Sequence, residues 1–345
     1  MLNGHGDDLY KYNDIKINFS SNVYSHFDQS GLFAHLAECL PKVTNYPDPT
    51  PVALEAALAE QWRIKPSQVM VTNGATEAIY LIAQAFRGST SAIAGPTFSE
   101  YADACRLNQH RVLNDECGTD DAEARLTWIC NPNNPTGSVL AKGELERMIS
   151  QKAERQQYVV IDASYAPFTS ESVPTTAEGV RFGNTLMLHS MTKEYAIPGL
   201  RLGCVTGDEV LLGKVKRCRM PWSVNRVAQD AGLYLLQHKD DYTLDVMALM
   251  AERRRVANAL GALPRIEVCP SDTHILLCKI SGGSASHLKD YLACRHGMLI
   301  RDASNFEGLT TGHFRIAIQT REENDALIKA VAQYEKETSQ QACGE

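Results

Sequence analysis

The chain has 345 residues, of which 44% are hydrophobic and 22% are charged, and its formal net charge at pH 7 is −7. These proportions are typical of a soluble globular protein with more than one domain, and the negative charge argues against a nucleic-acid-binding protein. The first eight residues are polar and acidic, and no apolar run approaches the roughly 20 residues that a membrane span needs. We therefore expect a cytoplasmic protein with no nucleic-acid or membrane partner.

Ten cysteines are scattered along the chain. None forms a C-x-x-C pair, and no His/Cys cluster has the spacing of zinc ligands. We expect reduced, mostly buried thiols and no metal site.

Short apolar or β-branched runs alternate with longer helical patterns, which predicts an α/β domain with a mostly parallel sheet. The first clear strand, Gln68–Thr72, is followed by N-G-A-T-E and by a helix that runs to Phe86. The start of that helix, at Gly74, Ala75 and Thr76, offers free N–H groups and a hydroxyl to a phosphate. Glycine also lets an anion approach the backbone closely. Many α/β turns share this pattern, so it does not identify a ligand by itself.

Two later segments contain an aromatic and an amide side chain that can contact a cofactor ring. Phe98 follows the sequence G-P-T and can stack on an aromatic cofactor, although a phenylalanine of the core is the commoner case. The strand Leu126–Cys130 ends in N-P-N-N-P-T-G, from which Asn134 can reach a ring hydroxyl. Turn formation explains that motif equally well without a ligand.

The next buried strand, Tyr158–Ile161, ends at Asp162. A carboxylate in this position can keep a pyridine nitrogen protonated, which makes the ring an electron sink. A helix N-cap is the alternative interpretation of Asp162. Tyr165 follows three residues later and can also reach a ring hydroxyl.

The strand Thr185–His189 ends at Ser190, and the sequence S-M-T-K-E-Y-A-I-P-G-L-R-L-G follows. Its hydroxyls and Arg201 suit a phosphate, which arginine can bind bidentately, and Lys193 can hold a carbonyl group covalently. A phosphate and an aldehyde on one small molecule describe pyridoxal 5'-phosphate. Alternatively, Ser190 is a helix N-cap with Lys193 in solvent. The serine nucleophile of penicillin-binding proteins also begins S-x-x-K, but it needs a K-T-G that this chain lacks.

Each polar motif follows the carboxyl end of a predicted strand, which is where open α/β sheets bind ligands. This placement favours the cofactor interpretation over the capping ones. We place a large cofactor-binding domain at residues 45–229 and a small substrate-closing domain at residues 1–44 and 230–345. The small domain is predicted to contain two strands and a closing helix: His274–Cys278, His313–Ile318 and Glu322–Tyr334.

Together these motifs resemble the fold-type I, class I/II aminotransferase superfamily, from His5 to about Lys336. The matching segments run in the order of that superfamily: N-G-A-T-E at 73–77, N-P-N-N-P-T-G at 131–137, D-A-S-Y at 162–165, S-M-T-K at 190–193 and G-L-R-L-G at 199–203. The resemblance implies a large domain with a mostly parallel sheet, a smaller α/β lobe from the two chain ends, and pyridoxal 5'-phosphate as cofactor.

The resemblance also implies a role for each motif residue, with Lys193 as the catalytic lysine that carries the cofactor. The other implied contacts are Gly74, Ala75, Ser190 and Arg201 at the phosphate, Asp162 at the pyridine nitrogen, Asn134 and Tyr165 at the ring oxygen, and Phe98 stacked on the ring. Tyr46 matches a tyrosine that such enzymes extend into the phosphate site of the neighbouring subunit, which implies a homodimer.

Two arginines of the C-terminal part indicate the kind of substrate. Arg315, in F-R-I-A, resembles the superfamily's arginine for the substrate α-carboxylate, and Arg301 opens the segment R-D-A-S-N-F-E-G-L. Two arginines near one substrate suit a dianionic amino acid such as an amino-acid phosphate. The resemblance implies six substrate contacts: His5, Gly6, Asn22, Asn134, Arg301 and Arg315. For His5, a mobile terminal residue is the alternative.

Two families of the superfamily act on phosphorylated amino compounds: the L-threonine-O-3-phosphate decarboxylases of cobalamin synthesis and the histidinol-phosphate aminotransferases. The N-terminal G-H-G-D-D, the N-F-S-S-N at 18–22 and the segment at 301–309 look more like the decarboxylases. Asp7 and the sequence V-Y-S-H at 23–26 depart from their pattern. The resemblance implies decarboxylation of O-phospho-L-threonine to aminopropanol phosphate, with histidinol-phosphate aminotransferase as the alternative. Both reactions use the same residues, and the choice depends on how the substrate is oriented.

Overall fold

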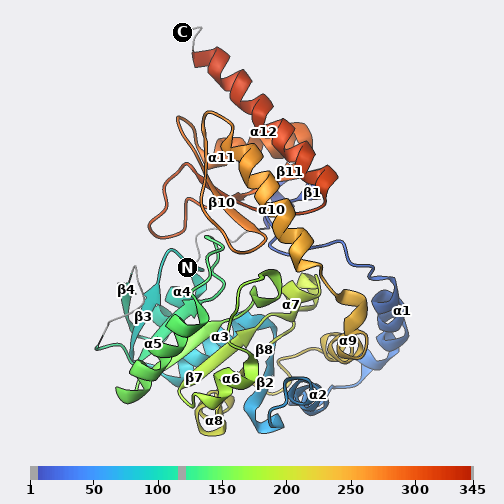
Figure 1. Ribbon diagram of the computed structural model, residues 1–345. Coiled ribbons are helices and arrows are strands. Elements are labelled where there is room, and N and C mark those ends of the chain that lie inside the picture. Colours follow the sequence, from blue (N-terminus) through green and yellow to red (C-terminus); the bar gives the residue numbers. More distant parts are fainter. Residues whose placement is uncertain (1–6, 116–121, 343–345) are drawn as a thin grey trace.

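The computed structural model describes residues 7–115 and 122–342 and consists of two α/β parts. In Figure 1 the large part, with a central sheet, lies below a smaller part that includes the C-terminal helix. This is the predicted class of fold. In the described part of the chain, no helix is long and apolar enough to cross a membrane.

Seven strands form the sheet of the large part, in the spatial order β2-β8-β7-β6-β5-β3-β4. They are β2 (Val69–Thr72), β3 (Thr90–Ala94), β4 (Arg111–Asp115), β5 (Leu126–Cys130), β6 (Tyr158–Asp162), β7 (Thr185–His189) and β8 (Gly203–Gly207). Strand β8 is antiparallel to both of its neighbours, and the other pairs are parallel. The prediction of a mostly parallel sheet is therefore confirmed.

Apolar packing on both faces of this sheet explains why its central strands are continuous apolar runs. Successive residues of β5 point to opposite faces, so Trp128 joins one core cluster and Ile129 joins another. Val160 and Ile161 of β6 divide between the same two clusters. Helices cover both faces, as Figure 1 shows.

The helices that surround this sheet are α1 (Ser30–Cys39), α2 (Val52–Trp62), α3 (Gly74–Ala85), α4 (Glu100–Leu107), α5 (Lys142–Glu154), α6 (Thr176–Arg181), α7 (Met191–Glu194), α8 (Glu209–Lys216) and α9 (Arg226–Gln237). Several begin at a side chain that accepts a hydrogen bond from the first turn. Thr175 and Glu178 form a capping box at α6, and Asp208 caps α8. Such caps satisfy backbone N–H groups that have no partner within the helix.

The smaller part is built on an antiparallel sheet of four strands in the order β12-β13-β10-β9. Its elements are β9 (Ile266–Val268), β10 (Ile275–Ile280), β12 (Arg301–Asp302), β13 (His313–Ala317), α10 (Val246–Gly261), α11 (Ala285–His296) and α12 (Arg321–Ala342). Strand β1 (Ile17–Asn18) pairs in parallel with β11 (Met298–Leu299), so the two ends of the chain meet in this part. Short 3-10 helices complete the chain: η1 (Leu9–Lys11), η2 (Leu40–Thr44), η3 (Pro66–Gln68), η4 (Ala166–Phe168), η5 (Pro198–Leu200) and η6 (Lys239–Tyr242).

One N-terminal helix packs differently from the predicted division of the chain. Residues 1–44 were assigned to the small domain, yet Leu32 on α1 packs in one cluster with Leu54 and Val71 of the large part. The apolar face of α1 therefore contributes to the core beneath the large sheet. The domain limits at residues 45 and 229 stay a prediction.

Candidate active site

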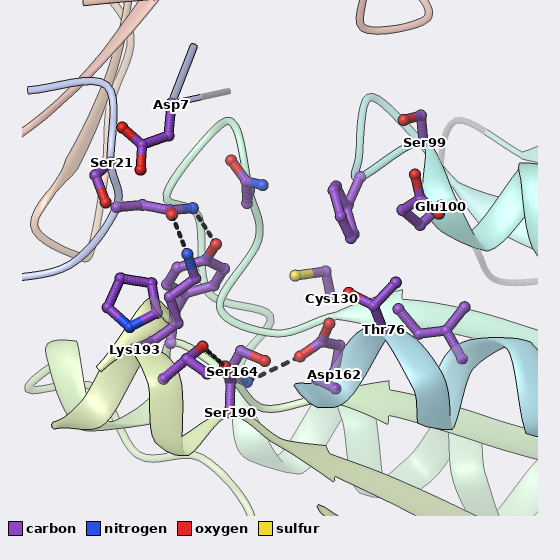
Figure 2. A pocket seen from close by; sticks show the side chains of 18 of the residues that line it. Asp7, Ser21, Thr76, Ser99, Glu100, Cys130, Asp162, Ser164, Ser190 and Lys193 are labelled. Carbon is purple, nitrogen blue, oxygen red and sulfur yellow. Dashed lines mark hydrogen bonds between the residues drawn. The ribbon is translucent and has the colours of Figure 1, made fainter. Parts of the chain in front are cut away.

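A cavity of about 590 Å³ lies at the carboxyl ends of the parallel strands, where side chains of the two parts meet. It brings together most of the residues singled out from the sequence. Those that line it are Asn22, Ala75, Thr76, Phe98, Asn134, Asp162, Tyr165, Ser190, Lys193, Arg201, Arg301 and Arg315. Figure 2 shows Lys193, Ser190 and Asp162 around this hollow.

The start of α3 and the guanidinium of Arg201 form one end of the cavity. Gly74 has a φ of 76°, and a Cβ on it would lie 2.6 Å from Nη2 of Arg201. Glycine at this position therefore lets the guanidinium of Arg201 approach the backbone at the start of α3, where N–H groups and the arginine can donate to one anion. Ser190 Oγ and Thr192 Oγ1 share a hydrogen bond of 2.7 Å at the same end. Backbone N–H groups, hydroxyls and an arginine at one place are suited to a phosphate.

Gly74→Ala is expected to destabilise the protein by about 1–2 kcal/mol, because an L-residue is strained at this φ. It should also weaken cofactor binding by roughly tenfold, because the methyl group displaces Arg201. Denaturant unfolding and a cofactor titration measure the two effects. Gly88→Ala is the matched control, since Gly88 also has a φ of 76° but has no atom within 4 Å of the added Cβ. Equal cofactor affinity in the two variants would contradict the assigned phosphate site.

Lys193 lies on α7 and faces a chain of polar groups. Its Nζ donates to Oδ1 of Asn22 at 2.5 Å, and Nδ2 of Asn22 donates to the hydroxyl of Tyr165 (Figure 2). Burial, with a contribution from the nearby Arg315, lowers the pKa of Lys193 to about 8. Ser190 stands at the N-cap position of α7, but its side chain makes no capping bond. The interpretation of S-M-T-K as a capped helix with a solvent-exposed lysine is therefore wrong.

The capture of the cofactor aldehyde by the cofactor-free protein should rise with pH with a midpoint near 8, where the pKa of Lys193 lies. Only the neutral amine is a nucleophile, so lowering the pKa of the lysine moves the reactive form to lower pH. The absorbance change after mixing, followed from pH 6 to pH 10, gives this midpoint. The same titration with free Nα-acetyl-lysine, whose amine has an ordinary pKa of about 10.4, is the reference. It shows how much of the pH dependence comes from ionisation of the cofactor and not from Lys193. A midpoint equal to that of the free amino acid would show that the site does not perturb Lys193.

The carboxylate of Asp162 stands at the end of β6, in the floor of the cavity. Its Oδ2 accepts a hydrogen bond of 2.6 Å from the hydroxyl of Tyr101, and its Oδ1 accepts one of 2.9 Å from the N–H of Ser164. Asp162 is not an N-cap at the head of a regular α-helix, because the short helix η4 begins four residues later. A buried carboxylate held in this way is suited to a cationic ring nitrogen.

The two predicted substrate arginines are direct partners in the register of β12 and β13, so Arg301 and Arg315 lie side by side. Arg315 donates to Oδ1 of Asn134 and to the carbonyl oxygen of Ser20, each at 2.5 Å. Its Nε is buried and has no hydrogen-bond partner among the described residues. Burial lowers the pKa of Arg315 to about 10, which still leaves a cation at neutral pH. Arg301 donates to Asn305 at 2.8 Å. This end of the cavity is therefore built to bind an anion.

Among the described residues, two predicted ones do not line this cavity: Gly74, which lies behind Arg201 at the start of α3, and Tyr46. His5 and Gly6 lie outside the described residues. Tyr46 is 85% exposed and its ring lies 5.5 Å from that of Trp222. Tyr46 is therefore not part of the cavity of its own subunit.

The sequence interpretation missed several residues of the site. Tyr101 donates to Asp162, Thr192 pairs with Ser190, and Asp7 lines the cavity mouth. Phe98 precedes α4, so helical spacing did not connect Tyr101 with it. No pattern in the sequence pointed to these three residues.

The geometry fits pyridoxal 5'-phosphate. Arg201 beside Gly74, with Ser190 and Thr192, suits a phosphate, Lys193 supplies an amine of lowered pKa, and Asp162 supplies a buried carboxylate in the same cavity. Phe98 and Asn134 complete the walls. Within residues 7–115 and 122–342, no cluster of three or more His, Cys, Asp or Glu side chains could hold a metal ion.

Comparison with known proteins agrees with this geometry. The family model for aminotransferase class I and II matches residues 14–331. A histidinol-phosphate aminotransferase of Thermoanaerobacter sp. is 30% identical over 305 residues, which cover 84% of each chain. A threonine-phosphate decarboxylase of Salmonella typhimurium is 29% identical over 335 residues, which cover 92% of this chain and 91% of the relative. The crystal structure of L-threonine-O-3-phosphate decarboxylase from Porphyromonas gingivalis superposes with a TM-score of 0.90 at 36% identity, covering 93% of this chain and 100% of that one.

Proposed function

The chain belongs to the class I and II aminotransferase family, whose members use pyridoxal 5'-phosphate, and from this we propose that it decarboxylates O-phospho-L-threonine. The observation that carries the proposal is the 36% identity to the Porphyromonas gingivalis decarboxylase across nearly the whole fold. The paired arginines opposite Lys193 support it, because the substrate has two anionic groups. The product would be aminopropanol phosphate, for use in cobalamin synthesis.

Each residue of the site would have a separate role in this reaction. Arg315 and Arg301 would bind the anionic groups of the substrate, and Asn134 orients Arg315 through its hydrogen bond. When bound, the cofactor supplies a ring that accepts the electron pair released as a bond to the α-carbon breaks. In a decarboxylation the carboxylate leaves as CO₂, and the amine of Lys193 would deliver the proton that replaces it on the α-carbon.

Histidinol-phosphate aminotransferase is the second candidate function, favoured by the Thermoanaerobacter relative at 30% identity. Here Lys193 would remove a proton from the α-carbon of the substrate, in place of delivering one. The same anion site would then hold the phosphate of histidinol phosphate. Both candidates use one set of side chains, so the products must distinguish them.

Product analysis of the purified holoenzyme tests the choice. With O-phospho-L-threonine alone, we expect release of CO₂ and one equivalent of aminopropanol phosphate. Addition of 2-oxoglutarate should not change the rate, because decarboxylation needs no amino acceptor. No CO₂ release, together with glutamate formation from histidinol phosphate and 2-oxoglutarate, would establish the aminotransferase instead.

We also propose that the protein is a cytoplasmic homodimer in which Tyr46 reaches the phosphate site of the second subunit. The exposed apolar side chains around Tyr46 support this, since Val43, Met220 and Trp222 are each about half exposed or more. Sedimentation velocity of the holoenzyme should give the mass of two chains. A monomeric protein that retains its cofactor fully would contradict the proposal.

A further inference from the structure

Tyr101 lies in the first turn of α4, where it lines the cavity beside Asp162, and packing fixes its ring. Its side chain is 1% exposed. It stacks on Trp128 with ring centroids 5.7 Å apart and planes inclined by 25°, and its edge contact with Phe98 has the same centroid separation. A ring held on two sides by aromatic neighbours has little freedom to rotate. The position of its hydroxyl is therefore determined by the core.

The hydroxyl of Tyr101 donates a hydrogen bond of 2.6 Å to Oδ2 of Asp162. Asp162 is 6% exposed, and burial of a carboxylate costs free energy unless hydrogen bonds or a cation compensate. In the part of the chain that the structure describes, no cationic side chain lies within salt-bridge distance of it. Its compensation comes from the Tyr101 hydroxyl and from the Ser164 N–H, which donates to the other oxygen.

The groups that face this hydroxyl keep it a donor at every accessible pH. Burial and the adjacent Asp162 raise the pKa of Tyr101 well above its ordinary value. Cys130 of β5 also faces the hydroxyl, and burial raises the pKa of that thiol, which stays neutral. The hydroxyl of Tyr101 therefore keeps its proton and donates it to the hydrogen bond with Asp162.

We propose that Tyr101 is a positioning residue, which holds the Asp162 carboxylate toward the ring nitrogen of the cofactor and stabilises its charge by a donated hydrogen bond. A donated hydrogen bond stabilises the charged form of a carboxylate and lowers its basicity. The bond thus sets how the proton is shared between Asp162 and the ring. This role rests on the cofactor of the family and holds for either candidate reaction, since both need the ring as electron acceptor.

Tyr101→Phe tests the proposal through the absorbance of the bound cofactor, without turnover. Phenylalanine keeps both aromatic contacts and removes one hydroxyl. Asp162 should then become more basic and draw the shared proton away from the ring, so the ring withdraws fewer electrons. The nitrogen that joins the cofactor to Lys193 would hold its proton to higher pH. We expect the midpoint of the spectral pH titration to rise by about one unit and the cofactor to dissociate roughly tenfold faster.

Tyr334→Phe is the matched control, because Tyr334 is also 1% exposed and its hydroxyl bonds to one side chain, Nδ1 of His287, in the smaller part. It should melt at a lower temperature and leave both cofactor measurements unchanged. In an Asp162→Asn background, Tyr101→Phe should have no further effect on cofactor dissociation, because Tyr101 acts through the carboxylate. A folded Tyr101→Phe variant with the wild-type midpoint, or additive effects in the double variant, would overturn the proposal and assign Tyr101 to packing alone.

Discussion

Lys193→Ala is expected to lower kcat by at least about 10⁴-fold, because one side chain supplies both the covalent attachment and the proton transfer. The structure supports both roles. The amine lines the cavity, its pKa is lowered to about 8, and Asn22 holds it at 2.5 Å. Steady-state kinetics with O-phospho-L-threonine, or with histidinol phosphate if that proves to be the substrate, measures the loss.

A chemical rescue and a control variant distinguish loss of the Lys193 amine from loss of the folded structure. Methylamine at high concentration should restore part of the activity of Lys193→Ala, because it can occupy the space that the lysine leaves. Lys65→Ala removes an exposed lysine that pairs with Glu209, and it should behave as wild type since exposed ion pairs contribute little. Activity of Lys193→Ala within about tenfold of wild type would refute the assigned role.

Asp162→Asn has the second-largest expected effect, a decrease in kcat of roughly 10³-fold. Asparagine has nearly the same shape, but it has one carbonyl oxygen in place of two carboxylate oxygens, so it can keep only one of the bonds from Tyr101 and Ser164. It carries no negative charge, so it cannot keep the ring nitrogen protonated. The loss should therefore appear in kcat, and the lost hydrogen bond should also lower the melting temperature of the cofactor-free protein. Steady-state kinetics and thermal unfolding give the two values.

The control for Asp162→Asn is the same substitution at a surface helix cap. Asp208 accepts from the N–H groups of Val210 and Leu211 at the start of α8. Asparagine caps a helix about as well as aspartate, so Asp208→Asn should keep both activity and stability. If Asp162→Asn retained wild-type kcat, Asp162 would not control the protonation of the cofactor.

Much of the fold and of the cofactor site could be predicted from the sequence because the relevant signals are local. The strands Leu126–Cys130 and Thr185–His189 have the predicted limits, since apolar runs followed by turn residues mark strand ends. The phosphate-binding turn at Gly74 and the lysine at 193 also lie within short motifs. The packing of α1 differed from prediction because its apolar residues do not indicate which core they join.

The hydrogen bonds between residues of the site could not be predicted from the sequence. Tyr101 and Asp162 are 61 residues apart in the chain, and Lys193 and Asn22 are 171 apart. Such pairs form when elements far apart in the chain pack against each other. The residue types alone do not specify which side chains of two packed elements come into contact. The same reason explains why Asp7 and the carbonyl of Ser20 were missed.

The sequence by itself determined which residues carry the chemistry and at which strand ends they stand, because a strand, its turn and the following helix are specified by neighbouring residues. Only the tertiary structure decided how deeply those residues are buried, which partners they bind and how their pKa values shift. Pairing of β12 with β13 places Arg301 beside Arg315, and burial of Lys193 lowers its pKa. Packing also leaves Tyr101 as a buried donor to Asp162. Desolvation and hydrogen bonding depend on what surrounds a group in space, and those surroundings come from segments far apart in the chain.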